Sequence, residues 1–276
     1  MFIDYAWREY FSNPHEGTGT TYERFILHKY FERLRKRYSI EKVLEVPSFG
    51  MTGLSGINSL WWAYNGATVT ILDDDEERIH LIKGVWQGLS LQANFVYQPY
   101  GSRILPFKDK SFDLGWNFAS LRFVSDLNNF LIELVRVSTK VIFICVPNQG
   151  NIWNFMLRLS QGKEKDAQTS SLNPDGIEDI MEELGWHTHE RGYFDVPPWP
   201  DIAMKKEDFL RKIGFNRLAQ KLEKRNGGYL SILDYFNNNN RNMESEMLRH
   251  SFLERFPSVF KRFWAHHEYF IFAPKQ

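Results

Sequence analysis

Two short apolar runs flank a glycine-bearing loop between residues 42 and 79, and an acidic cluster follows the second run. Residues 43–46 and 68–72 are rich in β-forming side chains and show no helical period, whereas residues 57–64 between them can form a helix. The pattern predicts a βαβ unit. Its two strands would run parallel, with the helix crossing one face of the sheet, so the segment restricts the chain to α/β folds.

The loop and the acidic cluster of this unit predict a ligand site. The first loop of a βαβ unit lies at the carboxyl edge of the sheet, where backbone N–H groups and a helix N-terminus face a ligand. Gly50, Gly53 and Gly56 in the loop permit close approach of the backbone. Asp73 and Asp74 lie at the tip of the next strand, within reach of ribose hydroxyls. We therefore expect a nucleoside-binding site at this edge.

Strands and helices continue to alternate along the chain, which predicts a doubly wound sheet with helices on both faces. A helix is expected before the βαβ unit, at residues 20–38, where apolar residues recur at helical spacing. The later helices are expected at residues 76–88, 124–137 and 176–184, and the later strands at residues 94–98, 112–117, 140–146 and 186–194. Residues 267–272 predict a closing strand.

The pattern changes between residues 197 and 264, which begin with PPWP and include an asparagine run and a helical pattern near 243–256. We interpret this segment as a helical insertion before the last strand, placed to cap the carboxyl edge and the substrate. The predicted organisation is an N-terminal helical segment (1–40), a Rossmann-like core (41–196 and 265–276) and the inserted cap (197–264).

The charge and cysteine content of the chain limit the classes of binding partner and the cellular location that we expect. Thirty-four basic residues balance 34 acidic ones, so total charge does not favour nucleic acid or an anionic membrane, and a small-molecule substrate is expected. No apolar run approaches the ~20 residues of a bilayer span. The single cysteine, Cys145, lies in the apolar run VIFICVP and is expected to be buried. We predict a cytoplasmic protein of unknown oligomeric state.

The segment from residue 42 to residue 148 resembles the class I S-adenosylmethionine-dependent methyltransferases, in particular the type 11 methyltransferase domain. The resemblance rests on VLEV, the glycine-bearing loop, ILDDDEERI, VIFICVPN and above all LPFKDKSFD at residues 105–113. It implies a seven-stranded sheet whose last strand is antiparallel, with S-adenosylmethionine across the carboxyl edge. It also implies an enzyme that transfers the methyl group to an acceptor by in-line displacement.

The donor-binding residues that the resemblance implies are Glu45, Ser48, Gly50, Gly53, Gly56, Asp73, Asp74, Asn117 and Phe118. The family's glycine motif is displaced here, because PSFGMTGLSG follows Glu45 and only Gly56 keeps the position of the last glycine. Asp73 matches the family's ribose-binding acid, while the acid expected near the adenine amine is replaced by Gly101. The alternatives are a tight crossover without a ligand and a helix-capping role for Asp73.

The acceptor pocket is expected between the N-terminal segment and the loop after the sixth strand. Its candidate residues are His15, Glu16, Tyr22, Glu23, Tyr193, Asp195 and Trp199. A methyl group on a sulfonium is already activated, so positioning in a dry cavity can suffice and no catalytic residue is assigned. The alternatives are a solvated terminal loop and a proline corner packed by aromatic residues.

Metal binding is not expected. His187 and His189 alternate on one strand and His266 and His267 are adjacent, but neither pair completes a recognisable ligand set. Two other functions stay open. One is a non-catalytic methyltransferase-fold protein that acts as a partner or scaffold subunit. The other is a nicotinamide dehydrogenase, which would need the compact G-x-G-x-x-G turn that this chain lacks.

Overall fold

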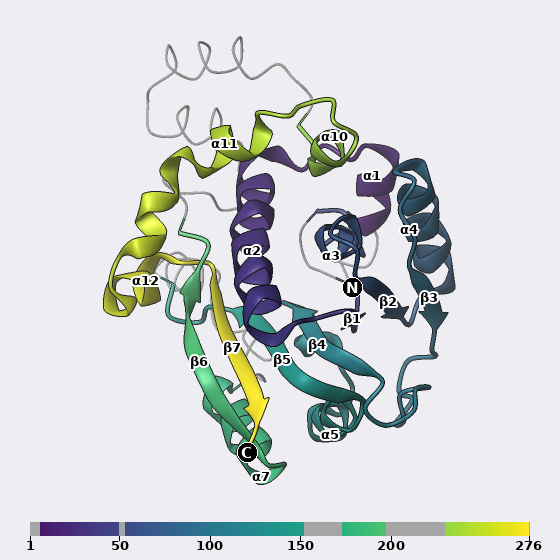
Figure 1. Cartoon of the computed structure of the whole chain (residues 1–276), viewed down its shortest axis with the longest axis vertical. Helices are drawn as coiled ribbons and strands as arrows, with labels where there is room; N and C mark the ends of the chain where they lie inside the picture. Colours follow the sequence, from purple (N-terminus) through teal and green to yellow (C-terminus); the bar gives the residue numbers. More distant parts are fainter. Residues whose placement is uncertain (1–5, 50–52, 152–172, 197–229, 276) are drawn as a thin grey trace, which may run out of the picture.

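A seven-stranded sheet in the order β3-β2-β1-β4-β5-β7-β6 forms the centre of the molecule (Figure 1). The structure is a computed structural model that describes residues 6–49, 53–151, 173–196 and 230–275. The first five strands are parallel and comprise β1 (Lys42–Glu45), β2 (Thr68–Asp73), β3 (Asn94–Tyr97), β4 (Phe112–Phe118) and β5 (Ser138–Pro147). Their carboxyl ends therefore share one edge.

The last strand reverses the direction of the sheet. Strand β7 (His267–Pro274) lies between β5 and β6 (Trp186–Phe194) and pairs antiparallel with both. Because β7 is antiparallel, its first residue lies at the carboxyl edge of the parallel strands, where Pro147 pairs with His267. The predicted fold class, with its antiparallel last strand, is confirmed.

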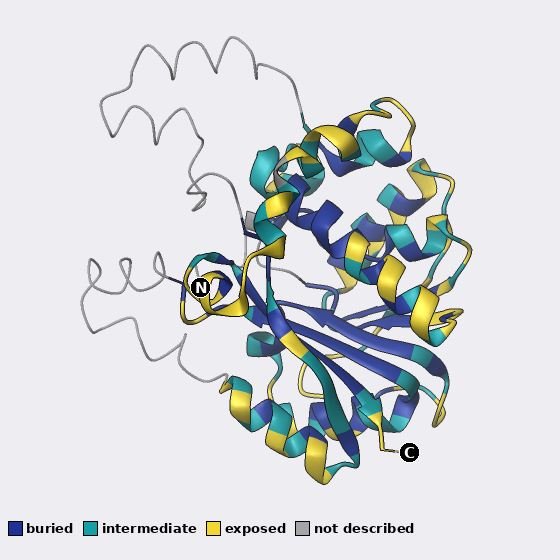
Figure 2. Ribbon diagram, turned by 60° about the vertical axis from the view of Figure 1, so that its left-hand side comes forward, coloured by how far each residue is buried: buried dark blue, intermediate teal, exposed yellow. Residues whose placement is uncertain are grey.

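Helices cover both faces of the sheet, and Figure 2 shows its strands buried between them. One face carries α2 (Gly17–Tyr38), α3 (Leu60–Tyr64) and α4 (Glu76–Gly88), and the other carries α5 (Leu127–Val137) and α7 (Pro174–Glu183). The remaining elements are α1 (Ala6–Ser12), η1 (Leu121–Phe123), α10 (Ile232–Phe236), α11 (Met243–Met247), η3 (Leu248–Arg255) and α12 (Ser258–Trp264). Each face thus has its own apolar core.

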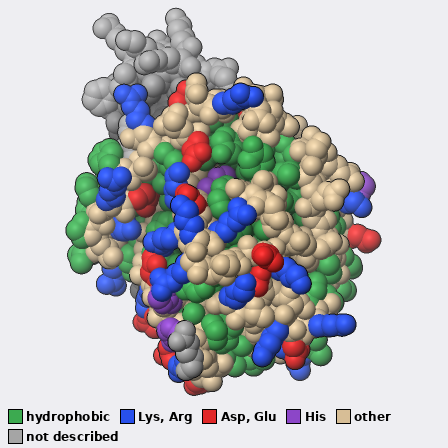
Figure 3. Space-filling view, in the orientation of Figure 1, with side chains coloured by type: hydrophobic (Ala, Val, Ile, Leu, Met, Phe, Trp, Pro, Cys, Tyr) green, Lys and Arg blue, Asp and Glu red, His purple; other side chains and the backbone are tan. Residues whose placement is uncertain are grey.

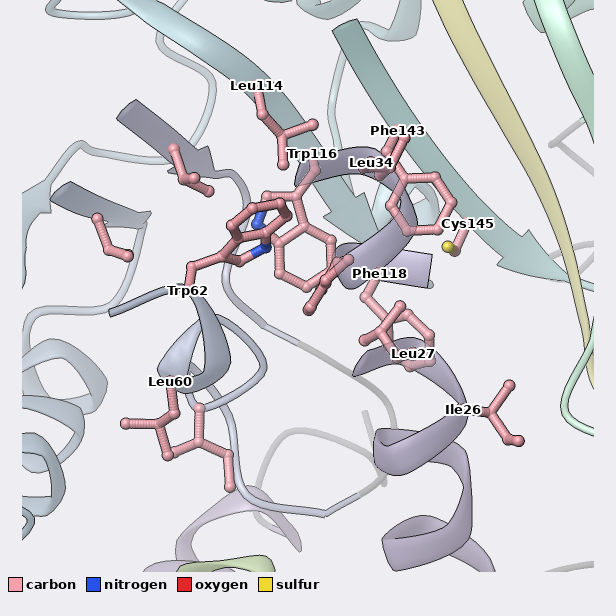
Figure 4. Packing of buried hydrophobic residues seen from close by; sticks show 14 of the residues in the cluster. Ile26, Leu27, Leu34, Leu60, Trp62, Leu114, Trp116, Phe118, Phe143 and Cys145 are labelled. Carbon is pink, nitrogen blue, oxygen red and sulfur yellow. The ribbon is translucent and has the colours of Figure 1, made fainter. Parts of the chain in front are cut away.

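Aromatic packing holds α2 against the sheet. The side chain of Phe31 is fully buried and meets Trp116 of β4 edge-on, with ring centroids 4.9 Å apart. Leu27 and Leu34 lie one turn to either side on the same face of the helix, and Figure 4 shows both beside the core aromatic residues. The position of α2 is therefore fixed along its length, which places its N-terminal half at the carboxyl edge.

Several predicted helices differ from the observed ones; α2 begins three residues early, at Gly17, and α7 spans Pro174–Glu183 rather than 176–184. Helix α3 begins at Leu60 rather than residue 57, because residues 53–59 form turns of the long loop. Helix α5 begins at Leu127, where Asp126 caps it by accepting a hydrogen bond from the Asn129 amide at 3.0 Å. The single helix expected near 243–256 is divided into α11 and η3. Among the described helices, none is both long and apolar enough to cross a bilayer.

Candidate functional site

The candidate site lies at the carboxyl edge, where the tips of β1, β2 and β4 meet. Register pairs Glu45 at the end of β1 with Ile71 of β2 and with Trp116 of β4. Asp73 ends β2, and Phe118 ends β4. The structure therefore brings the predicted donor-binding residues of three strands to one edge, as the topology requires.

The glycine-bearing loop lies against the start of α2. Gly53 and Gly56 both have positive φ angles, of +72° and +68°. A Cβ at Gly53 would lie 2.5 Å from an oxygen of Glu16, and a Cβ at Gly56 would lie 2.5 Å from Ile82 of α4. Both positions therefore exclude larger residues for two reasons, backbone conformation and lack of space. Gly50 lies outside the described residues.

A buried ion pair connects this loop to α2. The Nε of Arg24 donates to the carboxylate of Glu16 at 3.0 Å, and the Leu54 amide donates to the same carboxylate at 2.8 Å. The Arg24 guanidinium also donates to the Leu54 carbonyl at 3.1 Å and to the side chain of Asn58. Glu16, a predicted acceptor-binding residue, is thus engaged in fixing the loop, and its role toward a substrate stays a prediction.

Asp73 is fully buried and bonded on both carboxylate oxygens. One oxygen accepts from the Nε of Arg78 at 2.9 Å and from the Asp75 amide at 3.0 Å, and the other accepts from the Ser48 hydroxyl. Arg78 also pairs with the exposed Asp74 at 2.8 Å. The structure therefore joins Ser48, Asp73 and Asp74 in one network. The cation of this network is the guanidinium of Arg78, which no local motif indicates.

Aromatic rings cover this network. The guanidinium of Arg78 lies 4.4 Å from the centre of the Phe49 ring and 5.2 Å from that of Trp7. Phe49 is itself buried and packs edge-on against Phe123 of η1, with centroids 4.8 Å apart. In this arrangement, ribose hydroxyls reach Asp73 only if Phe49 and Arg78 move.

Among the buried oxygen atoms near this edge that have no hydrogen-bond partner within the described residues are Oε2 of Glu45 and Oδ1 of Asn117. Asn117 uses its amide nitrogen to donate to the Val46 carbonyl at 3.2 Å. Burial raises the pKa of Glu45 from 4.5 to about 7, against the lowering effect of a hydrogen bond from Ser59. Buried oxygens without partners are costly, so a ligand with N–H donors or positive charge suits them, as S-adenosylmethionine does through its ammonium and sulfonium groups.

A second polar cluster lies at the start of β7, beside the tip of β4. The rings of His267 and Phe118 have centroids 4.7 Å apart, and Nε2 of His267 lies 2.9 Å from a carboxylate oxygen of Glu23 on α2. The adjacent His266 pairs through Nδ1 with Asp195, at 2.8 Å. The cluster therefore unites residues from α2, from the loop after β6 and from β7.

Tyr22 joins this cluster through Glu254 of η3. The Tyr22 hydroxyl donates to the Glu254 carboxylate at 3.2 Å, and the Val196 amide donates to the same oxygen at 2.6 Å. Burial raises the pKa of Glu254 to about 7, and burial followed by the charge of Glu254 raises the pKa of Tyr22 well above 10. Glu254 lies far from Tyr22 in the sequence, so no local pattern could have indicated this contact.

Of the other predicted acceptor residues, the structure describes His15 and Tyr193, which belong to different segments of the fold. His15 accepts a hydrogen bond from the Leu230 amide at 2.8 Å, which attaches the N-terminal segment to the start of α10. Tyr193 is half-buried on β6, where its position in the register is opposite Glu268. Trp199 lies outside the described residues. Contact of any of these residues with a substrate stays a prediction.

A cavity of about 530 Å³ opens on the outer side of α2, away from the carboxyl edge. Figure 3 shows this face, where basic and acidic side chains are interspersed over α2. Its lining residues are His28, Lys29, Glu32, Arg35, Lys36, Trp61, Asn65 and Glu244. Burial, followed by the charge of Arg24, lowers the pKa of His28 to about 3, so that side chain is neutral. The cavity contains none of the predicted site residues.

A family profile described as "Methyltransferase domain" matches residues 50–141. The malonyl-[acyl-carrier protein] O-methyltransferase of Erwinia billingiae is 37% identical over 78 residues, which are 28% of this chain. The match spans 29% of the length of that relative, which is less than a third.

Solved structures share the fold at low sequence identity. The plantazolicin methyltransferase BpumL, in complex with SAH, superposes with a TM-score of 0.51 at 15% identity, over 92% of this chain and 85% of its own. The YcgJ protein of Bacillus subtilis gives 0.50 at 12% identity, over 91% and 98%. Residues 50–141 of this chain therefore match a methyltransferase domain profile, and the chain shares its fold, with the sheet order established above, with these solved structures.

Proposed function

We propose that this protein transfers a methyl group from S-adenosylmethionine to a small-molecule acceptor. The observation that carries the proposal is that buried oxygens of Glu45 and Asn117 have no partner among the described residues, near the edge where the matched domain would hold its donor. Balanced total charge supports a small acceptor over a polyanion.

The donor would supply a methyl group on positively charged sulfur. In the proposed complex, Glu45 and Asn117 accept hydrogen bonds from the donor or face its positive charge, and the backbone of the loop around Gly53 and Gly56 follows its surface. Phe118 would line the space beneath the sulfur. The protein's contribution is then to exclude water and to hold the acceptor in line with the sulfur–methyl bond.

The acceptor would lie between the N-terminal half of α2 and the segment 197–264, which we propose as its cap. Tyr22 and Glu23 of α2 already lie beside residues that follow β6 or begin β7, in particular Asp195 and His267. These contacts support an acceptor pocket closed from both sides. His15, Tyr193 and Trp199 remain proposed contributors to that pocket.

A second candidate function is a non-catalytic partner or scaffold subunit. The specific observation in its favour is that both oxygens of Asp73 are satisfied by the protein itself, under the Phe49 ring. A chain that no longer binds the donor would be expected to replace ligand contacts by internal ones such as Arg78–Asp73. Donor binding separates the two candidates.

Titration calorimetry of the whole chain with S-adenosylmethionine, S-adenosylhomocysteine and NADH tests the proposal. We expect micromolar binding of both adenosyl compounds and none of NADH. Asn117→Ala should lower the affinity for S-adenosylhomocysteine about tenfold, which corresponds to the loss of one hydrogen bond of ~1.4 kcal/mol. Asn239→Ala, at an exposed position of the 237–240 loop, is the control and should leave the affinity unchanged. Failure of wild type to bind either compound would support the scaffold function, and selective NADH binding would support a dehydrogenase.

A further inference from the structure

We infer that Glu23 and His267 form a proton-accepting dyad for the methyl acceptor, with Nδ1 of His267 as the base atom. The inference rests on the proposed methyltransferase function and assigns a role to a side-chain pair that neither the domain match nor the fold specifies. It also restricts the substrate class, because an acceptor served by this dyad carries a proton on the atom that is methylated.

The geometry of the pair defines where its protons lie. Nε2 of His267 faces the Glu23 carboxylate at 2.9 Å. An ionised carboxylate can only accept hydrogen bonds, so Nε2 carries the proton in this contact. Neutral imidazole has a single N–H, and Nδ1 is therefore left with its lone pair. A carboxylate that fixes the tautomer and orientation of a histidine in this way is the arrangement that makes the other nitrogen an effective base.

The base atom has no partner of its own. Nδ1 of His267, a residue that is only 8% exposed, is buried and makes no hydrogen bond to any residue that the structure describes. Buried polar atoms are nearly always satisfied, and an exception calls for a ligand or a catalytic role. An acceptor O–H or N–H donating to Nδ1 would provide the missing partner.

The surroundings place the dyad on the acceptor side of the site. The imidazole lies between Phe118 at the tip of β4, at 4.7 Å, and Phe194 at the end of β6, at 5.5 Å between ring centroids. These rings exclude water and suit a planar acceptor. Although β7 lies two strands from β4 in the sheet order, His267 contacts Phe118 of the donor side through its ring, whereas Glu45 and Asp73 belong to β1 and β2.

Two further carboxylates, those of Asp195 and Glu254, belong to the polar cluster around the imidazole. Asp195 has one oxygen 4.0 Å from Nε2 of His267, but that oxygen is bonded to His266 at 2.8 Å. Glu254, the third carboxylate of the cluster, bonds Tyr22 and the Val196 amide. Each acid therefore has a hydrogen-bond partner of its own, and one ligand atom each of Glu23, Asp195 and His267 lie within 4.8 Å of one another.

The acceptor's oxygen or nitrogen forms a bond to the methyl carbon while the carbon–sulfur bond breaks, and the bonding electrons remain on sulfur as the neutral thioether. The proton of the acceptor passes to Nδ1 of His267. The resulting imidazolium is stabilised by the Glu23 carboxylate and later loses its proton to water.

Histidine-selective ¹⁵N NMR of the whole chain tests the dyad without any acceptor. In the presence of S-adenosylhomocysteine, we expect neutral His267 to carry its proton on Nε2 and to leave Nδ1 unprotonated. The NMR signal of His267 is identified as the one that disappears in His267→Gln. Glu23→Gln should shift the tautomer population toward Nδ1–H, and Glu23→Asp should preserve Nε2–H. A proton on Nδ1 in wild type, or a spectrum that Glu23→Gln does not change, would overturn the inference.

Methylation supplies the second readout. In an S-adenosylhomocysteine-release assay with phenols, carboxylic acids, primary amines and thiols, His267→Gln should lower kcat about 100-fold or more at unchanged KM for the donor. His189→Gln, on β6 away from the edge, is the matched control. Undiminished turnover in His267→Gln would overturn the dyad. So would stoichiometric Mn²⁺ binding that Glu23→Gln abolishes, because the cluster would then be a metal site.

Failure of this inference can be distinguished from failure of the proposed function. Calorimetry with S-adenosylhomocysteine should give affinities within about threefold for wild type and His267→Gln, since His267 meets the donor side only through a ring contact with Phe118. If the donor binds but the tautomer is wrong, only the dyad fails; if the donor does not bind wild type, the methyltransferase proposal fails. Should a single variant not fold, Glu23→Gln/His267→Gln removes both partners and leaves neither charge unpaired.

Discussion

Individual ionisable side chains at the carboxyl edge fall into two groups. Arg24 with Glu16 and Arg78 with Asp73 are buried pairs in which each charge has a partner, and they fix the loops around the site. Glu45 has no ion-pair partner among the described residues, and one of its oxygens accepts no hydrogen bond from them. Burial of an unpaired carboxyl favours its neutral form, so this side chain makes stability depend on pH near neutrality.

Glu45 should lower the free energy of unfolding of the ligand-free protein as pH rises. Its pKa is raised from 4.5 to about 7 in the folded state, so between these values the folded state binds more protons than the unfolded state. The stabilisation is fully present below pH 4.5 and is lost as pH rises through 7, a loss on the order of 3 kcal/mol. Urea unfolding at pH 5 and pH 8 should therefore show a smaller pH-dependent loss in Glu45→Gln than in wild type.

The exposed Glu183→Gln at the end of α7 is the control for this measurement and should behave as wild type. An equal loss of stability in wild type and Glu45→Gln between the two pH values would show that another group carries the dependence. Addition of S-adenosylhomocysteine should reduce the difference if the ligand donates a hydrogen bond to this carboxylate.

Among the elements, the glycine-bearing loop is the least regular and the most dependent on its neighbours. Residues 53–59 form turns, and the loop is held by Glu16 of the α2 N-terminus and by Ile82 of α4. The sequence predicted the loop, its glycines and the flanking strands. It could not predict what the glycines face, because the contacting residues belong to elements separated from them by more than 25 positions.

Replacement of Gly56 should lower the free energy of unfolding more than replacement of Gly66 does, although both residues have positive φ angles, of +68° and +87°. A Cβ at Gly56 would overlap Ile82, whereas at Gly66 no atom lies within 4 Å. We expect Gly66→Ala to lower the free energy of unfolding by ~1 kcal/mol through backbone strain alone, and Gly56→Ala by roughly 1–3 kcal/mol more through overpacking. Urea denaturation measures both, and equal losses would contradict the overlap with Ile82.

The molecule as a whole consists of one sheet with two separate apolar cores. Leu27 belongs to the core under α2, and Met181 belongs to the core under α7; both side chains are almost completely buried. The sheet separates them, so they share no contacts across it. Because every strand contributes to both cores, the two faces should nevertheless unfold in one transition.

Leu27→Ala and Met181→Ala should each lower the free energy of unfolding by ~2–5 kcal/mol. Their effects should add to within about 0.5 kcal/mol in the double variant, since distant sites without shared partners are independent. Denaturation followed by tryptophan fluorescence and by circular dichroism should give coincident curves. A coupling clearly above this range would show that the sheet transmits strain between its faces, and separate transitions would show that the faces are distinct folding units.

The order of strands and helices, the βαβ unit and the antiparallel closing strand were all indicated by the sequence together with its family resemblance. Hydrophobic periodicity and glycine positions are local properties, and they specify which segments become strands and helices. Some helix boundaries differ from the predicted ones where turns, a cap or a change of helix type decide the start, as at Leu60 and Leu127.

Only the tertiary structure decided which polar groups are engaged and which are left without partners. Asp73 carries the sequence position of a ribose-binding acid, yet Arg78 and Ser48 already bind it. His267 and Glu23 are 244 positions apart and become partners solely because β7 reverses direction beside α2. Hydrogen bonding and desolvation depend on what surrounds an atom in space, and no local sequence pattern contains that information.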